Sequence, residues 1–285
     1  MKLASFRQGE TNSFGIVLEE GIIDLGKRFA GKYSDLRSFI ADGGLQDTEV
    51  QKLNTSQEVD YPIAAAELLP VIPNPDKIIC VGANYDDHRN EANLDKSEHP
   101  IIFFRLAQSQ IGHEQAILLP PESQMLDFEG EIAIIIGREG RRISEGDAFQ
   151  YVAGYSCYND GSIRDWQIHT KQWGPGKNFN GTGPFGPWMV TSDEIDVTKQ
   201  PLKLVTRLNG EVVQETNTDY LIFSIPQIIN YVSTFTTLLP GDVIVTGTPA
   251  GIGAARKPQL FMKEGDVVEV EVSQIGVLRN TICAE

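Results

Sequence analysis

The stretch LDFEGEIAIIIG, residues 126–137, places three carboxylates directly ahead of one of the most apolar runs in the chain. Successive side chains of a strand point to opposite faces, so Asp127, Glu129 and Glu131 would all point the same way in a strand. A continuous apolar run such as residues 132–136 is typical of a strand buried on both faces. The stretch therefore predicts a core strand with a crowded acidic row at its start.

The composition of the chain indicates a globular protein with a solvated acidic surface. Its 285 residues are 41% hydrophobic and 22% charged, which suits one large domain or two unequal ones. The formal net charge of −15 argues against nucleic acid and against anionic membrane surfaces, which both favour dense Lys and Arg. No signal-peptide hydrophobic region and no apolar stretch near the ~20 residues of a transmembrane helix is visible. We expect a soluble, cytoplasmic protein with buried, reduced thiols at Cys80, Cys157 and Cys283.

Prolines divide the chain near residue 73, in the run YPIAAAELLPVIPNPDK. This density favours an extended connector, so we predict a small N-terminal α/β domain over 1–73 and a larger, strand-rich domain over 74–285. The first should contain short strands and two helices, DLRSFIAD, capped by Ser34, and DTEVQKL. The second should contain a hairpin around Asn209–Gly210 and a helix, SIPQIINYVSTF, capped by Ser224. Mostly local antiparallel hairpins then give a strand-rich α+β fold.

Glu129 and Glu131 could both reach one cation, because carboxylates at i and i+2 lie on the same face of a strand. Oxygen ligands favour Mg²⁺, Mn²⁺ or Ca²⁺ over zinc. Asp160, at the end of another apolar strand, could supply a third oxygen, while Arg164 and Gln167 could receive the anionic or carbonyl oxygens of a substrate. Two simpler interpretations stay open here, an exposed acidic strand edge and an ordinary Asn-Asp-Gly turn.

Four further side chains stand in patterns that suit catalysis. His88 has Glu91 three residues on, so in a helical turn the carboxylate could hold the imidazole as a general base. Lys177 stands among glycines, prolines and aromatics, where a weakly hydrated cation could stabilise an oxyanion. TGTPAGIG, residues 246–253, matches no nucleotide-binding motif and could form a pocket wall carrying the Thr248 hydroxyl. A solvated histidine, a solvent-exposed lysine and a plain Gly-Pro turn are the alternatives.

These motifs and their order resemble those of the fumarylacetoacetate hydrolase family. The matching pieces cover about residues 76–280 and are VGANYDDHRNEA, LDFEGEIAIIIG, AGYSCYNDGSIRDWQ, PGKNF, GPFGPW, NGEVVQ, PGDVIVTGTPAGIG, and GDVVEVEV followed by IGVLRN. The resemblance implies a mixed β-sandwich roll, generally dimeric, with a short N-terminal domain. It also implies a divalent metal, Mg²⁺ or Mn²⁺, on Glu129, Glu131 and Asp160, with Asp127 as a neighbour of the metal.

Carried over position by position, the resemblance also implies roles for the remaining residues. His88 with Glu91 matches a water-activating pair, and Lys177 matches an oxyanion lysine. Three positions match residues that contact substrate: Arg164, Gln167 and Thr248. Gly161 departs from the hydrophobic residue that many relatives have there, and the following segment resembles an acylpyruvase and 2-hydroxyhepta-2,4-diene-1,7-dioate isomerase-like subgroup. The departure leaves the specific substrate open.

The resemblance favours hydrolysis of a C–C bond in an acylpyruvate or diketo acid, giving pyruvate or another 2-oxo acid and a carboxylic acid. The metal would act as a Lewis acid, while His88 and Glu91 activate water and Lys177 stabilises the oxyanion. One alternative uses the same metal-enolate for decarboxylation or tautomerisation of oxaloacetate or a related oxo-diacid, or for isomerisation or hydration of a 2-oxo-dienoate. Another is a non-catalytic β-rich domain with a structural cation. As partners we expect a small 2-oxo acid and a second copy of the chain.

Overall fold

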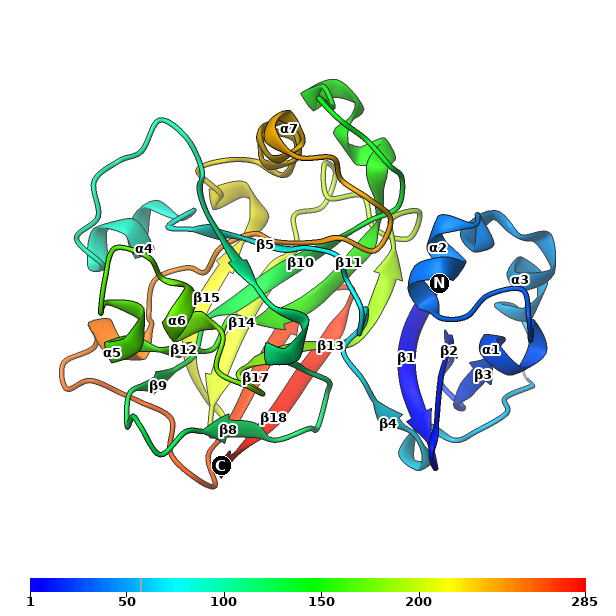
Figure 1. The fold of residues 1–285 in the computed structure, drawn as a ribbon, viewed down its shortest axis with the longest axis horizontal. Helices are drawn as coiled ribbons and strands as arrows, with labels where there is room; N and C mark the ends of the chain where they lie inside the picture. Colours follow the sequence, from blue (N-terminus) through cyan, green and yellow to red (C-terminus); the bar gives the residue numbers. More distant parts are fainter. Residues whose placement is uncertain (57) are drawn as a thin grey trace.

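An 11-stranded mixed sheet is the largest feature of the computed structural model, which describes residues 1–56 and 58–285 (Figure 1). Its strands follow the order β3-β2-β1-β13-β11-β10-β16-β5-β6, with β4 beside β1 and β7 beside β13. The bounds are β1 (Lys2–Gln8), β2 (Thr11–Val17), β3 (Ile22–Asp24), β4 (Glu67–Leu68), β5 (Ile78–Gly82), β6 (Ile101–Arg105), β7 (Gln110–Ile111), β10 (Gly130–Ile136), β11 (Val152–Asn159), β13 (Gly183–Thr191) and β16 (Val243–Val245).

A five-stranded sheet packs against the large one and follows the order β15-β14-β17-β18-β8. One hydrophobic core contains side chains of both, from β5, β10 and β11 on one side and from β14 and β17 on the other, so the two sheets form a sandwich. The bounds are β8 (Ile117–Leu119), β14 (Lys203–Leu208), β15 (Glu211–Asn217), β17 (Val267–Val272) and β18 (Gly276–Ala284), and a separate pair joins β9 (Leu126–Asp127) to β12 (Ser162–Ile163).

The helices are short and lie around the sheets (Figure 1). The longest, α7, has the predicted start, a capping box between Ser224 and Gln227. No helix in the described part of the chain is long and apolar enough to cross a membrane. The bounds are α1 (Leu25–Arg28), α2 (Leu36–Ala41), α3 (Thr48–Leu53), α4 (Asp86–Glu91), α5 (Arg164–Gln167), α6 (Gly174–Lys177) and α7 (Ile225–Phe235), with 3₁₀ turns at Gly44–Gln46, Ile63–Ala65, Ala107–Ser109, Glu145–Tyr151, Thr218–Tyr220 and Gly253–Ala255.

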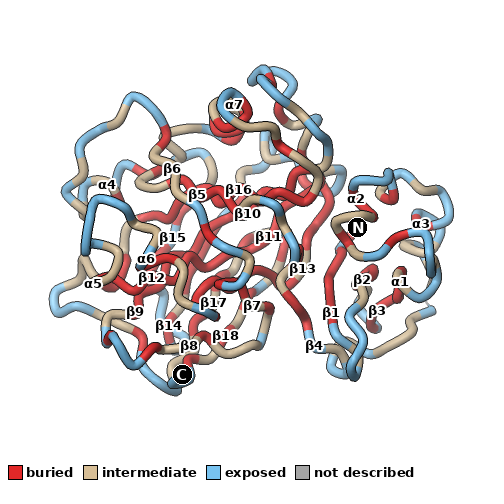
Figure 2. The backbone as a smooth tube through the Cα atoms, viewed as in Figure 1, coloured by how far each residue is buried: buried red, intermediate tan, exposed pale blue. Residues whose placement is uncertain are grey.

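Strand β10 is buried on both faces, as its apolar run predicts. Ile132, Ile134 and Ile136 belong to the core between the sheets, whereas Ala133 and Ile135 belong to the core on the opposite face, which includes side chains of the N-terminal segment. Figure 2 shows this strand and its neighbour β11 as buried along their lengths. A strand fixed on both faces is a rigid support for the acidic residues at its start.

The strand-rich α+β class is confirmed, and the predicted hairpin lies at Asn209–Gly210, whose φ angles of 52° and 83° suit a tight turn. The expectation of mostly local hairpins is wrong for the middle of the large sheet. There β1 pairs with β13, and β16 pairs in parallel with β5. Local turn signals do not report such pairings, because each one joins segments far apart in the sequence. The predicted division at residue 73 stays a prediction.

Two local expectations are wrong. Asp35, rather than Ser34, caps α2, because its carboxylate accepts a hydrogen bond of 2.7 Å from the Ser38 backbone N–H and thus satisfies a free donor of the first turn. Cys283 is exposed, unlike Cys80 and Cys157. It is the second-to-last residue of β18, and the last two residues of this strand are both exposed.

The pH dependence of stability should include a contribution from His113, which follows β7. Its Nδ1 accepts a hydrogen bond of 3.1 Å from the Arg279 backbone N–H, and burial, with the Arg279 guanidinium, holds its pKa below the ordinary 6.5. As the pH falls below 6.5 the unfolded chain takes up this proton first, so stability falls until the folded pKa is passed. In urea titrations at pH 7.5 and 5.5, His113→Gln should lose less stability than the wild type. An equal loss in both proteins would contradict this assignment.

Candidate active site

Three buried carboxylates meet where β10 begins and β11 ends. The antiparallel register pairs Gly130 with Asn159, and this brings Glu129, Glu131 and Asp160 together. One oxygen atom from each of these three residues, the acidic triad, lies within 4.8 Å of the others. Their exposed fractions are only 5%, 2% and 0%, so the exposed acidic edge and the plain turn are wrong interpretations.

The electrostatics of the triad differ from one member to the next. Burial, together with Asp160 and Glu129, raises the pKa of Glu131 well above its ordinary value. Burial acts in the same sense on Glu129, but the cations of Lys177 and Arg164 outweigh it and hold the pKa of Glu129 below its ordinary value. Three hard oxygen donors with incomplete charge compensation fit a divalent cation such as Mg²⁺ or Mn²⁺. The residues present therefore suit the metal that the sequence predicts.

Lys177 is 1% exposed and bridges two members of the triad. Its Nζ lies 2.7 Å from Glu129 Oε2 and 2.6 Å from Asp160 Oδ2, so the solvent-exposed lysine is a wrong interpretation. Arg105, at the end of β6, binds the other oxygen of Asp160 at 2.6 Å and is fully enclosed. Arg105 is not predicted from the sequence, because a basic residue that ends an apolar strand has no motif of its own.

Arg164 joins the triad to Asp127. Its Nε donates to Asp127 Oδ2 at 2.8 Å, and its Nη1 donates to Glu129 Oε1 at 2.6 Å and to Gln167 Oε1 at 2.9 Å. Its Nη2 is buried and has no hydrogen-bond partner in the described chain. Asp127 is thus a neighbour of the triad that holds Arg164, while Arg164 keeps unused donors.

His88 and Glu91 share one face of α4, as their spacing predicts. His88 Nδ1 lies 2.9 Å from Glu91 Oε1, and the Gly251 backbone N–H donates to the same carboxylate at 3.0 Å. A carboxylate only accepts hydrogen bonds, so Nδ1 is the donor of this pair, and in the neutral imidazole the free lone pair is on Nε2. His88 is 7% exposed, and the solvated histidine is therefore a wrong interpretation.

A cavity of about 180 Å³ collects most of the predicted residues. Its lining includes apolar side chains such as Phe103, Trp173 and Ile252. Glu91 and Asp160 are not among the lining residues, but they bind two that are, His88 and Lys177, respectively. Seven of the nine predicted site residues line it: His88, Glu129, Glu131, Arg164, Gln167, Lys177 and Thr248.

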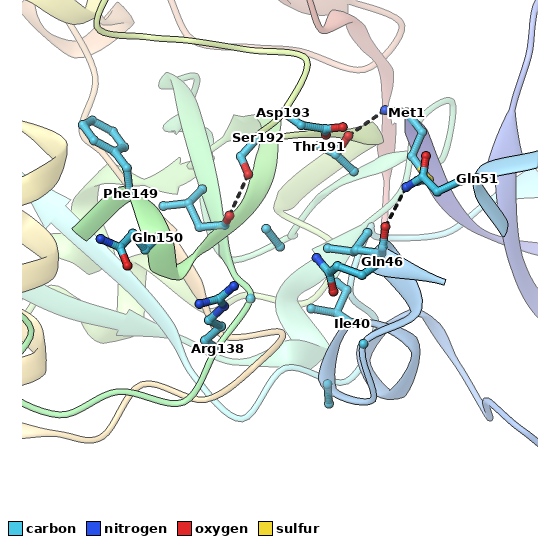
Figure 3. Close-up of a pocket in the computed structure, with 16 residues that line it drawn as sticks. Met1, Ile40, Gln46, Gln51, Arg138, Phe149, Gln150, Thr191, Ser192 and Asp193 are labelled. Carbon is cyan, nitrogen blue, oxygen red and sulfur yellow. Dashed lines mark hydrogen bonds between the residues drawn. The ribbon is translucent and has the colours of Figure 1, made fainter. Parts of the chain in front are cut away.

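A larger groove of about 700 Å³ lies elsewhere, between the N-terminal segment and the ends of β10, β11 and β13 (Figure 3). Its polar lining includes Gln46, Gln51, Arg138 and Asp193, and the amino group of Met1 donates to Thr191 Oγ1 there. None of the nine predicted residues lines it. The smaller cavity is therefore the candidate active site.

The chain is similar to known proteins over the region that contains these site residues. The family model "Fumarylacetoacetate (FAA) hydrolase C-terminal" matches residues 77–283. A curated oxaloacetate tautomerase of Rattus norvegicus, Fahd2a, mitochondrial, is 42% identical over 93% of this chain and 88% of its own. A fumarylacetoacetate hydrolase from Exiguobacterium antarcticum superposes with a TM-score of 0.87, 34% identity and full coverage of both chains. A maleylpyruvate hydrolase from Sphingobium sp. SYK-6, in complex with manganese(II) and pyruvate, gives 0.81 and 27% over 100% and 99% of the two chains.

Proposed function

The chain belongs to the fumarylacetoacetate hydrolase family, and on this basis we propose that it is a divalent-cation-dependent tautomerase that interconverts the enol and keto forms of oxaloacetate or a related short 2-oxo diacid. The motifs of the sequence favour C–C bond hydrolysis, with this reaction as the alternative. The tautomerase name of a relative 42% identical to this chain favours the alternative. The same name places that relative in mitochondria, whereas the sequence of this chain predicts the cytoplasm.

The main support for the proposal is that two triad members, Glu129 and Glu131, line one cavity of about 180 Å³ together with His88 and Arg164. The Nη2 group of Arg164 has no hydrogen-bond partner in the described chain. The cavity volume is below the roughly 300–1,000 Å³ of sites for drug-sized ligands. A short diacid suits such a space, and its carboxylate suits a buried guanidinium with free N–H groups.

The charges of the site also suit an anionic substrate. Four buried carboxylates, those of the triad and Asp127, lie among three basic groups, Arg105, Arg164 and Lys177. When all are ionised the cluster carries one excess negative charge. A bound divalent cation, held by the triad, would reverse this sign and supply Lewis acidity to the oxygens of a 2-oxo acid.

His88 is the group that we assign to proton transfer. Its free Nε2 can take a proton from C3 of the keto form; the C3–H pair becomes the C2=C3 double bond and the C2=O π pair moves onto O2. Protonation of O2 completes the enol, and the reverse steps regenerate the ketone. Glu91 keeps His88 in the required tautomer, while the Lys177 ammonium offers positive charge near the reacting oxygens.

The test is an assay of oxaloacetate tautomerisation at low buffer concentration, where the uncatalysed reaction is slow enough to subtract. The enol absorbs in the ultraviolet, so its loss reports the rate with Mg²⁺ or Mn²⁺ and with EDTA. We expect metal-dependent acceleration by the wild type. If the protein did not accelerate the tautomerisation of oxaloacetate with either metal, the proposed reaction would be overturned.

Hydrolysis of an acylpyruvate is the second candidate, because the His88–Glu91 pair could equally activate a water molecule. The similarity to a maleylpyruvate hydrolase supports it. Incubation with a panel of acylpyruvates, followed by detection of pyruvate and the released carboxylic acid, separates the two. Release of both products, with no effect on the oxaloacetate enol, would favour the hydrolase.

Arg164→Lys should weaken substrate binding more than turnover. Lysine keeps a positive charge beside Asp127 and Glu129 but has no equivalent of Nη2 for the substrate. We expect KM to rise roughly 10–100-fold, since a hydrogen bond to a charged group contributes about 1.5–3 kcal/mol. Steady-state kinetics with Arg138→Lys, an exposed arginine, provides the control. An unchanged KM would remove Arg164 from the substrate site.

The predicted homodimer is also a proposal. Strand β6 is the last strand of the large sheet. It contains Phe104 and is followed by Leu106, and both of these apolar side chains are exposed. An uncovered apolar edge favours self-association. Light scattering on the purified protein measures the molar mass directly. A mass of one chain at micromolar concentration would contradict the dimer.

A further inference from the structure

The glycine-rich loop after β16, residues 246–254, holds three acidic side chains by its backbone N–H groups. Gly247 donates to Glu131 Oε2 at 2.5 Å, and Gly251 donates to Glu91 at 3.0 Å. Gly253 and Ala254 donate to the two oxygens of Asp127 at 2.8 and 2.9 Å. The loop therefore fixes a triad carboxylate, the partner of His88 and the partner of Arg164 at once.

Gln214, on β15, fastens this loop to the sheet. Its Nε2 donates to Thr248 Oγ1 at 2.8 Å and to the Pro249 carbonyl at 2.9 Å, and its Oε1 accepts from the Gly130 N–H at 2.9 Å. Gln214 is 2% exposed, so water cannot readily replace these bonds. All the hydrogen-bonding atoms of its side chain are thereby used in a buried contact between β10 and the loop.

Gln214 and Thr248 both bind the backbone of Gly130, the residue between two members of the triad. Gly130 separates Glu129 from Glu131; its N–H donates to Gln214, and its carbonyl accepts from Thr248 Oγ1 at 3.0 Å. Gln214 and Thr248 are bonded to each other, so the three residues close a ring. The Thr248 hydroxyl gives its hydrogen to Gly130, which leaves it no hydrogen to donate to a substrate.

We propose that Gln214 is a positioning residue for the cation site, setting the separation of Glu129 and Glu131 and the position of the 246–254 loop. The inference rests on the cation-binding part of the proposed function and not on the reaction that follows. Partners that orient metal ligands typically change metal affinity or activity by roughly 10–100-fold when they are removed. Gln214 does not line the cavity, so it acts only through the residues that it holds.

Binding of Mn²⁺ to purified protein, measured by titration calorimetry, tests this without any assay of turnover. Gln214→Met keeps the length of the side chain and removes its three hydrogen bonds. The matched control is Thr206→Val, because the buried Thr206 hydroxyl has no partner in the described chain and packs directly against Gly130. We expect Mn²⁺ affinity to fall roughly 10–100-fold in Gln214→Met and to stay unchanged in Thr206→Val.

If Gln214→Met fails to fold, a second pair of variants tests the same hydrogen-bonded ring at Thr248. Thr248→Val removes the hydroxyl, and Thr248→Ser restores it, so Mn²⁺ affinity should be lost in the first and largely recovered in the second. Wild-type affinity in a folded Gln214→Met, or in Thr248→Val, overturns the positioning role and leaves the proposed function intact. Weakened affinity alongside a wild type that does not act on oxaloacetate supports the positioning role and overturns only the reaction.

Discussion

Glu131→Gln is expected to abolish cation-dependent turnover while leaving the protein at least as stable as the wild type. Glu131 is 2% exposed and lies with two other carboxylates, so its negative charge is buried beside like charges, which disfavours folding. Glutamine has the same shape and can accept the hydrogen bond from the Gly247 N–H. We expect Mn²⁺ affinity to fall more than about 100-fold, because even residues that only orient ligands cost roughly 10–100-fold.

Glu129→Gln should differ from Glu131→Gln in its effect on stability. Glu129 is paired with both Lys177 and Arg164, and removal of one partner from a buried ion pair typically costs about 3–5 kcal/mol. Both variants should lose Mn²⁺ binding, but in EDTA only Glu129→Gln should show a lower thermal midpoint. Glu139→Gln, at an exposed position just past β10, is the control for both. Full activity of Glu131→Gln, or a binding constant like that of the wild type, would remove Glu131 from the cation site.

The sequence was most informative where function depends on short spacing. The i and i+2 carboxylates of Glu129 and Glu131, and the i and i+3 pair of His88 and Glu91, meet through the geometry of a single strand or helical turn. The glycines, prolines and aromatics around Lys177 predict it as a site residue, but they do not predict its ion pair with Glu129. These contacts need little knowledge of the tertiary structure.

The residues that the sequence did not reveal depend on long-range packing. Arg105 reaches Asp160 across 55 positions, and Gln214 reaches Gly130 across 84. In the sequence Gln214 is merely one member of an alternating hairpin strand, and nothing local distinguishes it from a surface glutamine. The order of strands in the large sheet was hidden for the same reason, since β1 finds its partner β13 about 190 residues later.

His88→Gln is expected to reduce kcat by roughly 10²–10⁴-fold, the range of general acid–base catalysis, with Mn²⁺ affinity unchanged. Glutamine can still donate to Glu91, so α4 should keep its contact with the 246–254 loop, but glutamine has no group that exchanges protons near neutral pH. Proton transfer at C3 can be followed directly in D₂O, where the wild type should accelerate deuterium incorporation into oxaloacetate. The variant should lose that acceleration along with turnover.

His99→Gln separates this chemistry from a general effect of losing a histidine, because His99 is exposed and its ring stacks on Tyr231 outside the cavity. We expect it to keep the wild-type rate. If His88→Gln retained full turnover, a general-base role for His88 would be untenable, and a non-catalytic β-rich domain would gain support if no property changed at all. If turnover and Mn²⁺ affinity fell by the same factor, His88 would instead support the cation site. A loss of kcat at constant Mn²⁺ affinity is the result that only proton transfer explains, since neither the triad nor its orienting contacts would have changed.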